Sequence, residues 1–281
     1  MLLTRVLTAL LGAPLLVALI VWGPAWGFPA LTVVLVALAL HELYTLTTPG
    51  TPPWLRGLGI LVGSAIAASW LCCQGPQLAL AVATLGTLAL LLAHLRLAGE
   101  LPAAAPRIAA SLGGLAYGVL PLTHLGLLYQ LPPGWKLVLL VLLFTFAGDT
   151  LAYFVGRAVG RRPFAPRVSP KKTWEGALGG LLGSTLACLA WRQWVMPELT
   201  LVDVLVLGLG VGFCGQLGDL CESLIKRSVG VKDSGKLLPG HGGVLDRFDA
   251  VSFSAPLVYY YYLAFVDAAR PLQGWLQLKP F

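Results

Sequence analysis

The sequence predicts an all-α polytopic integral membrane protein with about nine transmembrane helices. Of 281 residues, 57% are hydrophobic and only 11% are charged, whereas about 25% of the residues of a soluble domain are charged. The apolar residues gather in stretches of about 20 residues, a length that crosses a bilayer as a helix. Too few charges remain to cover a water-facing surface, and disordered chains are poor in apolar residues. Soluble globular and disordered proteins are therefore excluded.

The apolar stretches follow one another along the chain, and most connections between them are short and rich in proline or glycine, as tight reversals are. The first stretch follows Arg5 and could pass for a signal peptide. Further spans follow it, so we expect an uncleaved first helix. The predicted spans are about 6–22, 28–46, 57–73, 77–94, 108–128, 136–155, 174–194, 201–221 and 250–266.

The distribution of lysine and arginine predicts the orientation of these spans, because cytoplasmic loops are enriched in both. With a cytoplasmic N-terminus, fifteen basic residues face the cytoplasm and four face the opposite side. The cytoplasmic set is Arg5, Arg56, Arg96, Arg107, Arg157, Arg161, Arg162, Arg167, Lys171, Lys172, Lys226, Arg227, Lys232, Lys236 and Arg247. The opposite set is Lys136, Arg192, Arg270 and Lys279. We therefore expect the N-terminus inside and the C-terminus outside.

We expect a single membrane domain over 1–281, in two parts of different character. The N-terminal part, 1–128, carries few ionisable residues and is predicted to be a helical scaffold. The C-terminal part, 129–281, contains two long, polar and basic loops at about 156–173 and 222–249. Both loops are cytoplasmic in the predicted topology. Because they carry most of the charge, the C-terminal part is expected to hold the chemistry.

Cysteine usage and net charge exclude two other kinds of function. The five cysteines lie in or beside apolar runs and show no CxxC or CxxH spacing, so neither a disulfide framework nor a structural zinc site is expected. The formal net charge is +7. In a membrane protein such an excess reports topology, so nucleic acid is not expected as a partner.

Asp149 is an acidic residue inside the predicted span 136–155, in its cytoplasmic-side portion. A charge at bilayer depth costs about 2.5–3.5 kcal/mol on insertion scales, so it needs a partner or a water-filled cavity. A carboxylate paired with a buried base for packing would satisfy this requirement. Intramembrane acids are nevertheless more often functional, which makes Asp149 a candidate site residue.

Asp219 lies near the cytoplasmic end of the predicted span 201–221. Glu222 and Ser223 follow at the third and fourth positions, so all three share one helical face. Lys226 continues that face one turn further on. A hydroxyl, carboxylates and an ammonium group on one stripe could bind a metal and a phosphate. They could equally form a solvated helix end, and these residues alone leave both interpretations open.

The 222–249 loop combines glycines, bases and acids directly before the last predicted span. Gly240, Gly242 and Gly243 allow backbone conformations that aim N–H groups at an anion, and the following helix offers its positive N-terminal end to phosphate. Asp246 and Asp249 lie near that helix start. N-capping is their simpler role, but carboxylate oxygens beside a phosphate site also suit Mg²⁺.

The 156–173 loop ends on two lysines and two hydroxyl residues at a helix entrance. Ser169, Lys171, Lys172 and Thr173 suit a polyphosphate, although a positive topology anchor is the simpler alternative. The spacing of a Walker A loop is absent.

Glycines recur at helical spacing inside the later spans. A dinucleotide-type GxGxxG pattern at 210–215 lies within an apolar helix with no preceding strand, so we attribute it to helix packing. The pairs Gly179/Gly183 and Gly208/Gly212 are expected to let neighbouring helices approach closely.

Together these polar segments resemble the motif of the phosphatidate cytidylyltransferases (CDP-diacylglycerol synthases). The motif runs from Ser223 to Asp249, and its companion segments are 149–157 and 169–176. It is long and specific and covers the C-terminal half, whereas the N-terminal half agrees only in hydropathy and span count. The matching positions are Ser223, Lys226, Arg227, Lys232, Asp233, Gly235, Pro239, His241, Gly242, Gly243, Asp246, Arg247 and Asp249.

The resemblance implies a reaction in which CTP and phosphatidate give CDP-diacylglycerol and pyrophosphate, with Mg²⁺ as cofactor and a second cation as a further option. It also implies an all-helical fold in the lipid bilayer with a cytoplasm-facing polar cavity, and a homodimer. The expected location is a bacterial-type inner (cytoplasmic) membrane with the active site on the cytoplasmic side.

On this resemblance the candidate catalytic residues are Asp149, Asp219, Lys226 and Asp246. Mg²⁺ is assigned to Asp219 and Asp246, with Asp149 and Asp249 as further candidate ligands. His241 is expected to donate to phosphate rather than act as a base, because a phosphate monoester is already largely ionised near neutral pH. Candidate substrate-binding residues are Ser169, Lys171, Lys172, Thr173, Ser223, Arg227, Lys232, His241, Gly242, Gly243 and Arg247.

Two alternatives remain open on the sequence. A related enzyme could transfer CMP to an isoprenoid-ether lipid phosphate with the same polar site and a different lipid wall. An ion-coupled transporter also needs intramembrane acids. Against transport, the charged residues cluster at one face and no inverted repeat is evident.

Overall fold

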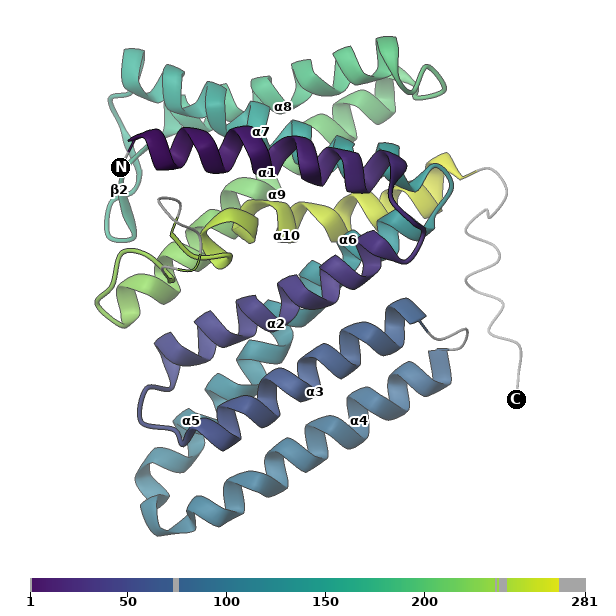
Figure 1. Ribbon diagram of the computed structural model, residues 1–281. Coiled ribbons are helices and arrows are strands. Elements are labelled where there is room, and N and C mark those ends of the chain that lie inside the picture. The colour runs from purple at the N-terminus through teal and green to yellow at the C-terminus, as the bar shows by residue number, and fades with distance from the viewer. Residues whose placement is uncertain (1, 73–75, 236, 238–241, 268–281) are drawn as a thin grey trace. The chain divides into compact units, whose positions relative to one another are not determined.

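The computed structural model describes residues 2–72, 76–235, 237 and 242–267, and it is almost entirely helical (Figure 1). The chain divides into two compact units. The first unit comprises Met1–Gln130 and Cys221–Asp249, and the second comprises Leu131–Leu220 and Ala250–Phe281. This division differs from the simple N-terminal and C-terminal halves expected from charge, because segment 221–249 joins the N-terminal helices.

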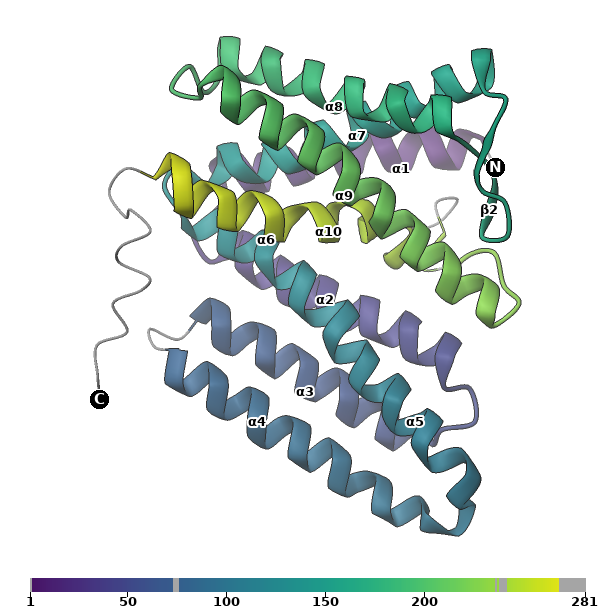
Figure 2. The same cartoon turned by 180° about the vertical axis from the view of Figure 1, so that it is seen from behind.

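The first unit is a helical bundle. In both views α3 lies between α2 and α4 (Figures 1 and 2). Tyr44 of α2 is fully buried, and its hydroxyl donates to the carbonyl of Ser111 at 2.9 Å. The N-terminal helical elements are α1 (Leu2–Trp22), α2 (Gly27–Thr47), α3 (Pro53–Cys72), α4 (Pro76–Ala93), a 3₁₀ segment (His94–Glu100), α5 (Leu101–Gly114), a π-helical segment (Leu115–Val119) and α6 (Leu120–Gln130).

The second unit is built on a close pair of helices, α7 and α8, joined by a two-stranded antiparallel hairpin. A Cβ atom on Gly183 would lie 2.7 Å from the carbonyl oxygen of Ala147, and one on Gly208 would lie 2.6 Å from Cα of Thr185. The predicted close packing through these glycines is confirmed. The elements are α7 (Gly134–Val159), β1 (Pro163–Ala165), β2 (Ser169–Thr173), α8 (Trp174–Trp194), α9 (Leu201–Ser228) and α10 (Leu245–Tyr261), followed by a π-helical segment (Tyr262–Val266).

The two units share α9 and α10, since the division falls after Leu220 and after Asp249. Six helical stretches among the described residues are long and apolar enough to cross a membrane. They are Gly27–Thr47, Pro53–Cys72, Pro76–Leu97, Leu101–Gln130, Gly134–Val159 and Leu201–Ser228. The other three predicted spans coincide with α1, α8 and α10. Within α1, the stretch Leu10–Trp22 is a shorter apolar helix, and the described residues of α8 and α10 are not among the six stretches. The predicted class, an all-α polytopic membrane protein, is confirmed.

The polar loops are shorter than the sequence predicted. The helix α9 continues to Ser228, and α10 begins at Leu245, so only 229–244 lies between the helices instead of 222–249. Helix α9 continues because Glu222 and Lys226 pair across one turn, which stabilises the helix at the point where it becomes polar. The other loop folds into the β1–β2 hairpin.

Candidate active site

A lysine–aspartate pair forms the polar cluster of the second unit. Lys172, on β2, places its Nζ 2.6 Å from Oδ2 of Asp219 on α9. Their side chains are 27% and 35% exposed, so the pair is accessible to a ligand. Asp149 of α7 interacts electrostatically with both residues and is itself exposed. The structure therefore brings together three of the predicted site residues from three separate elements.

The hairpin that carries Lys172 is fixed at its base by hydrogen bonds to the start of α8. Thr173 caps α8, since its Oγ1 accepts from the N–H of Gly176 at 3.2 Å. Glu175 accepts from the N–H of Arg161 at 3.0 Å and of Arg162 at 3.3 Å. These contacts close the segment before β1 onto the helix. They give the hairpin a defined position within this unit.

Adjacent residues of a strand point to opposite faces, which separates the two predicted phosphate-binding lysines. Lys172 is partly buried and reaches Asp219, whereas Lys171 is exposed. Ser169 begins β2 and is partly buried. One lysine of the pair is therefore held in the cluster, and the other remains at the surface.

Helix α9 is held against α8 one turn before Asp219. Nε2 of Gln216 donates to the carbonyl of Ala177 at 2.9 Å. A Cβ atom on Gly180 would lie 2.9 Å from that same Nε2. The amide therefore occupies space that only a glycine on α8 leaves open, and it aligns α9 with the helix that follows β2.

A second cluster, in the first unit, is organised around Lys226. Its Nζ donates to Oε2 of Glu222 and, at 2.6 Å, to Oδ1 of Asp246. All three side chains are at least nine-tenths buried. A buried charge is costly unless it is paired and hydrogen-bonded, and here the ammonium group meets two carboxylates.

Asp246 also ties the polar loop to the start of α10. Its Oδ2 accepts from the N–H groups of Ser234 and Gly243, at 3.0 and 2.9 Å. Burial opposes ionisation of Asp246, but the hydrogen bonds from Lys226 and these two N–H groups outweigh it and lower its pKa to about 2. Asp246 is thus a carboxylate at neutral pH, and the N–H of Gly243, expected to face a phosphate, is used by this side chain.

Glycine is needed at the turn before Asp246. Gly242 has a φ of +84°, a conformation that side chains disfavour. A Cβ atom there would lie 2.7 Å from Oδ2 of Asp246. The glycine-rich sequence therefore permits the turn that wraps the backbone around this carboxylate.

The remaining predicted residues take varied positions in the same segment. Ser223 is buried one turn before Arg227, which is exposed and donates to the carbonyl of Val231 at 2.7 Å. Lys232 and Arg247 are exposed, and Asp249 is partly buried. His241 lies outside the described residues.

Glu42 is a site-associated residue that sequence reasoning assigned to the scaffold. Its carboxylate, on α2, is buried and accepts hydrogen bonds from the 229–244 loop and the start of α10. The available signal was an acidic residue inside an apolar predicted span, the same signal that identified Asp149.

The side chains available as metal ligands limit which ions each cluster could bind. Among the described residues, no three or more His, Cys, Asp or Glu side chains form a group that could hold a metal. Mg²⁺ is usually held by one or two carboxylates together with waters and substrate phosphates. Asp149 and Asp219 fit that requirement in the second unit. Asp246, in the first unit, already binds Lys226 and two backbone N–H groups.

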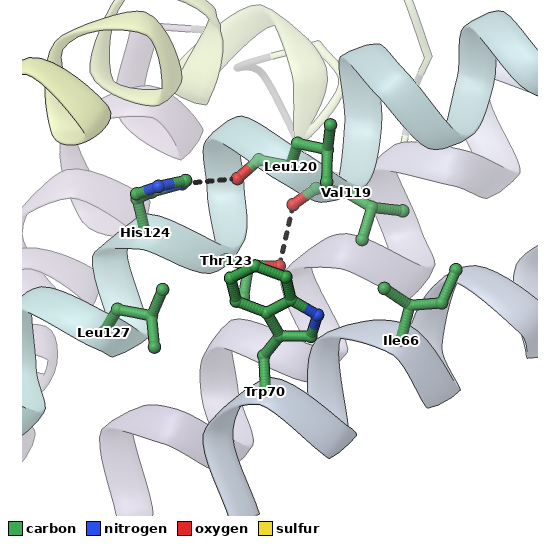
Figure 3. Close-up of a pocket in the computed structure, with 7 residues that line it drawn as sticks. All are labelled: Ile66, Trp70, Val119, Leu120, Thr123, His124 and Leu127. Atoms are coloured by element: carbon green, nitrogen blue, oxygen red, sulfur yellow. Dashed lines mark hydrogen bonds between the residues drawn. The ribbon is translucent and has the colours of Figure 1, made fainter. Parts of the chain in front are cut away.

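A small pocket in the first unit lies between α3 and α6 (Figure 3). Its two polar side chains bond to their own helix: Thr123 donates to the carbonyl of Val119 at 2.7 Å, and His124 bonds that of Leu120 at 2.7 Å. Ile66, Trp70 and Leu127 complete an apolar lining. The pocket offers no charged group for a phosphorylated substrate, so each of the two lysine–carboxylate clusters is a better candidate for binding one.

The fold and these clusters define a polytopic membrane protein with two lysine–carboxylate clusters. The model of the cytidylyltransferase family matches residues 3–265. The chain belongs to that family.

The chain is also similar to individual proteins, two of which are named as cytidylyltransferases. The chain is 36% identical over 249 residues to the uncharacterized protein YnbB of Escherichia coli K12, an alignment that covers 87% of this chain and 82% of that protein. It is 41% identical over 133 residues to the phosphatidate cytidylyltransferase of Haemophilus influenzae, covering 46% of each chain. It is 47% identical to the enzyme of that name from Synechocystis, covering 46% of this chain and 44% of the relative. The alignments to these two enzymes thus span somewhat less than half of their length.

Proposed function

We propose that the protein transfers the CMP group of CTP to phosphatidate, giving CDP-diacylglycerol and pyrophosphate. The observation that carries the proposal is the accessible pair of Lys172 and Asp219 with Asp149 beside it, in a chain of the cytidylyltransferase family. Relatives named phosphatidate cytidylyltransferase support phosphatidate as the acceptor.

In the proposed reaction, a phosphate oxygen of phosphatidate attacks the α-phosphorus of CTP. A new P–O bond forms, the bond from the α-phosphorus to the bridging oxygen breaks, and pyrophosphate leaves with that electron pair. Both reactants are anions. Catalysis therefore consists mainly of neutralising charge and holding the reactants in line.

The two lysines have different parts in this scheme. Lys172 is partly exposed and can exchange Asp219 for a phosphate oxygen, so it is proposed to hold the triphosphate. Lys226 is buried between two carboxylates, so its part is to keep the Asp246 carboxylate and the start of α10 in place. Lys171, Ser169, Ser223, Arg227, Lys232, His241 and Arg247 are proposed as further substrate-binding residues.

We propose Mg²⁺ as the cofactor, held by Asp219 and Asp149, with Asp246 and Asp249 as further candidate ligands. When bound, the ion would neutralise phosphate charge at the reacting centre. Oxygen ligands supplied by one or two carboxylates and the substrate phosphates are typical of Mg²⁺ in nucleotide enzymes. A second cation is a further option.

We also propose the orientation and setting of the enzyme. The fifteen-to-four distribution of basic residues favours a cytoplasmic N-terminus and a cytoplasmic active site, in a bacterial-type inner membrane where CTP is at hand. A homodimer is proposed on the family resemblance alone.

Pyrophosphate release tests the proposed function. Protein purified in detergent with Mg²⁺ is given CTP with phosphatidate, CTP with an isoprenoid-ether lipid phosphate, or CTP alone. We expect release with phosphatidate, its loss when EDTA removes the metal, and its return when Mg²⁺ is restored. Release only with the isoprenoid lipid would replace the acceptor, and no release with any lipid would favour the transporter alternative.

A further inference from the structure

Glu42 lies in the apolar helix α2 and is buried, with 5% of the residue exposed. In the part of the chain that the structure describes, no basic side chain is bonded to its carboxylate. Its carboxylate is satisfied by three donors from one distant segment. Oε1 accepts from the N–H of Val244 at 2.9 Å. Oε2 accepts from the N–H of Leu245 and from Oγ of Ser234, each at 2.9 Å.

These donors show what Glu42 does for the fold. Val244 and Leu245 stand at the start of α10, where the first N–H groups of a helix have no partner within it and the helix dipole favours a negative charge. Glu42 therefore caps α10 from a residue 203 positions away from Leu245 in the chain. Hydrogen bonds to an ionised carboxylate are among the stronger ones in proteins.

The loop is packed tightly enough against Glu42 to require glycine at two places. A Cβ atom on Gly235 would lie 2.6 Å from Oε1 of Glu42. One on Gly243 would collide with Oγ of Ser234 and with Oε2 of Glu42. Both glycines thus leave room for the carboxylate, and the glycine-rich sequence of this segment serves Glu42 as well as the turn around Asp246.

The capped segment leads directly to the charged cluster. Ser234 donates its hydroxyl to Glu42 and its backbone N–H to Asp246. Asp246 follows Leu245 in the chain and binds Lys226 at 2.6 Å. Two carboxylates, one from α2 and one from α10, therefore hold the same stretch of backbone. Movement at Glu42 would displace Asp246 and Lys226.

We propose that Glu42 is a positioning residue, which caps α10 and fixes the 229–244 loop so that Asp246 and Lys226 keep their catalytic geometry. The catalytic consequence of this inference rests on the proposed function. The capping of α10 by Glu42 rests only on the hydrogen bonds described above. It gives helix α2 a part in positioning the Lys226 cluster, beyond that of a scaffold.

The test uses full-length protein in detergent with three variants. Glu42→Gln keeps the side-chain length but replaces one acceptor oxygen with a donor, which then faces N–H or O–H groups. Ser234→Ala removes one of the three bonds and serves as the milder change if Glu42→Gln folds poorly. His41→Gln, at the exposed neighbouring position of α2, is the control. All activities are normalised to the folded fraction.

Two local readouts separate positioning from a general loss of stability. Hydrogen exchange at the amides of Val244 and Leu245 is measured by mass spectrometry. The rate at which an amine-reactive reagent modifies the side chain of Lys226 is measured as well. In Glu42→Gln we expect both rates to rise by about tenfold or more, while exchange in α3 stays unchanged. Turnover per folded molecule should fall by about 10- to 100-fold, as expected for displaced catalytic groups, with KM changed less than about threefold.

The possible results decide between the proposals. Unchanged exchange at Val244 and Leu245 in Glu42→Gln would overturn the capping role. A loosened loop with normal turnover would overturn the positioning role. A wild-type protein with no CTP-dependent turnover would instead reject the proposed function, and the exchange measurement would still decide whether Glu42 holds the loop.

Discussion

Each charged cluster is organised around one lysine, and the two lysines differ in how firmly they are held. Lys172 has a single carboxylate at 2.6 Å and is accessible. Lys226 is buried between Glu222 and Asp246. An exposed pair contributes little stability, so Lys172 can change partners at small cost. A buried pair is expensive to break, so Lys226 keeps its partners and fixes local geometry.

Neutralising the aspartate of either cluster is expected to stop catalysis. Asp219→Asn and Asp246→Asn keep the size of the side chain but remove the charge that pairs with lysine and that a metal would need. Because the pKa of Asp246 is about 2, its variant loses a full negative charge at neutral pH. We expect turnover to fall at least 100-fold, with the protein still inserted.

Glu198→Gln provides the control for loss of one carboxylate, because Glu198 is exposed between α8 and α9, outside both clusters, and its variant should keep near-normal turnover. The measurement is pyrophosphate release by each variant purified with Mg²⁺. Near-normal activity of Asp219→Asn or Asp246→Asn would show that the corresponding carboxylate has no part in the reaction.

The basic residues of the two units are expected to serve different substrates. Lys172 stands just before α8, whose N-terminus adds positive potential for a triphosphate. Arg227 lies near the polar end of α9 and is exposed, where a lipid headgroup would lie. Lys172→Ala should mainly weaken use of CTP, and Arg227→Ala should mainly weaken use of phosphatidate. Loss of a charge-assisted contact costs about 1.5–3 kcal/mol, or about one to two decades in kcat/KM.

Steady-state kinetics with each substrate varied in turn would measure this division. Arg167→Ala, at an exposed position between β1 and β2, is the control for loss of one positive charge. Equal effects on both substrates, or the reverse pattern, would disprove the assignment. Lower expression with unchanged kinetics per folded molecule would mean that both residues are topology anchors.

Among the elements, α7 and α8 set the positions of Asp149 and Lys172. The helices approach closely because glycines of one face the backbone of the other, as Gly183 faces Ala147. The capped start of α8 then orders β2. Helix packing in membranes depends on such small residues. Lipid tails are as apolar as leucine, so there is no hydrophobic driving force for two helices to associate.

A bulky residue in this contact should destabilise the second unit. In Gly183→Leu the new Cβ would meet the carbonyl oxygen of Ala147 at 2.7 Å and Cβ of Leu151 at 2.9 Å. Overpacking of this kind typically costs about 1–3 kcal/mol. Gly57→Leu is the control, since a Cβ there has nothing within 4 Å. Thermal unfolding in detergent should show a lower Tm for Gly183→Leu only, and equal Tm values would argue against close packing.

For the whole molecule, the sequence was sufficient to predict the fold class and most helix positions, because long apolar stretches are a local signal. It did not predict the β1–β2 hairpin, whose strands of three and five residues are too short to show an alternating pattern. Nor did it predict the role of Glu42. The bond from Ser234 to Glu42 joins residues 192 positions apart, and no periodicity in the sequence encodes such a contact. Candidate residues within one motif could be named from the sequence, but their hydrogen-bond partners from other helices could not.

The predicted topology can be tested by labelling single cysteines. In a protein whose native cysteines are replaced by serine, Lys232→Cys and Glu198→Cys place a thiol at exposed positions on opposite sides of the predicted membrane. We expect an impermeant reagent to label position 232 only from the cytoplasmic side and position 198 only from the other. Labelling of both from one face would change the number of spans and move the proposed site.

The central claim, CMP transfer to phosphatidate, is tested most directly by following the α-phosphorus of CTP. Purified protein with Mg²⁺ and phosphatidate is given CTP labelled at the α- or the γ-phosphorus, and the lipid and aqueous phases are separated. We predict that α-label enters the lipid phase and γ-label appears in aqueous pyrophosphate, with neither transfer in Asp219→Asn. Label from the γ-position in the lipid, or no label in the lipid from either position, would contradict the account.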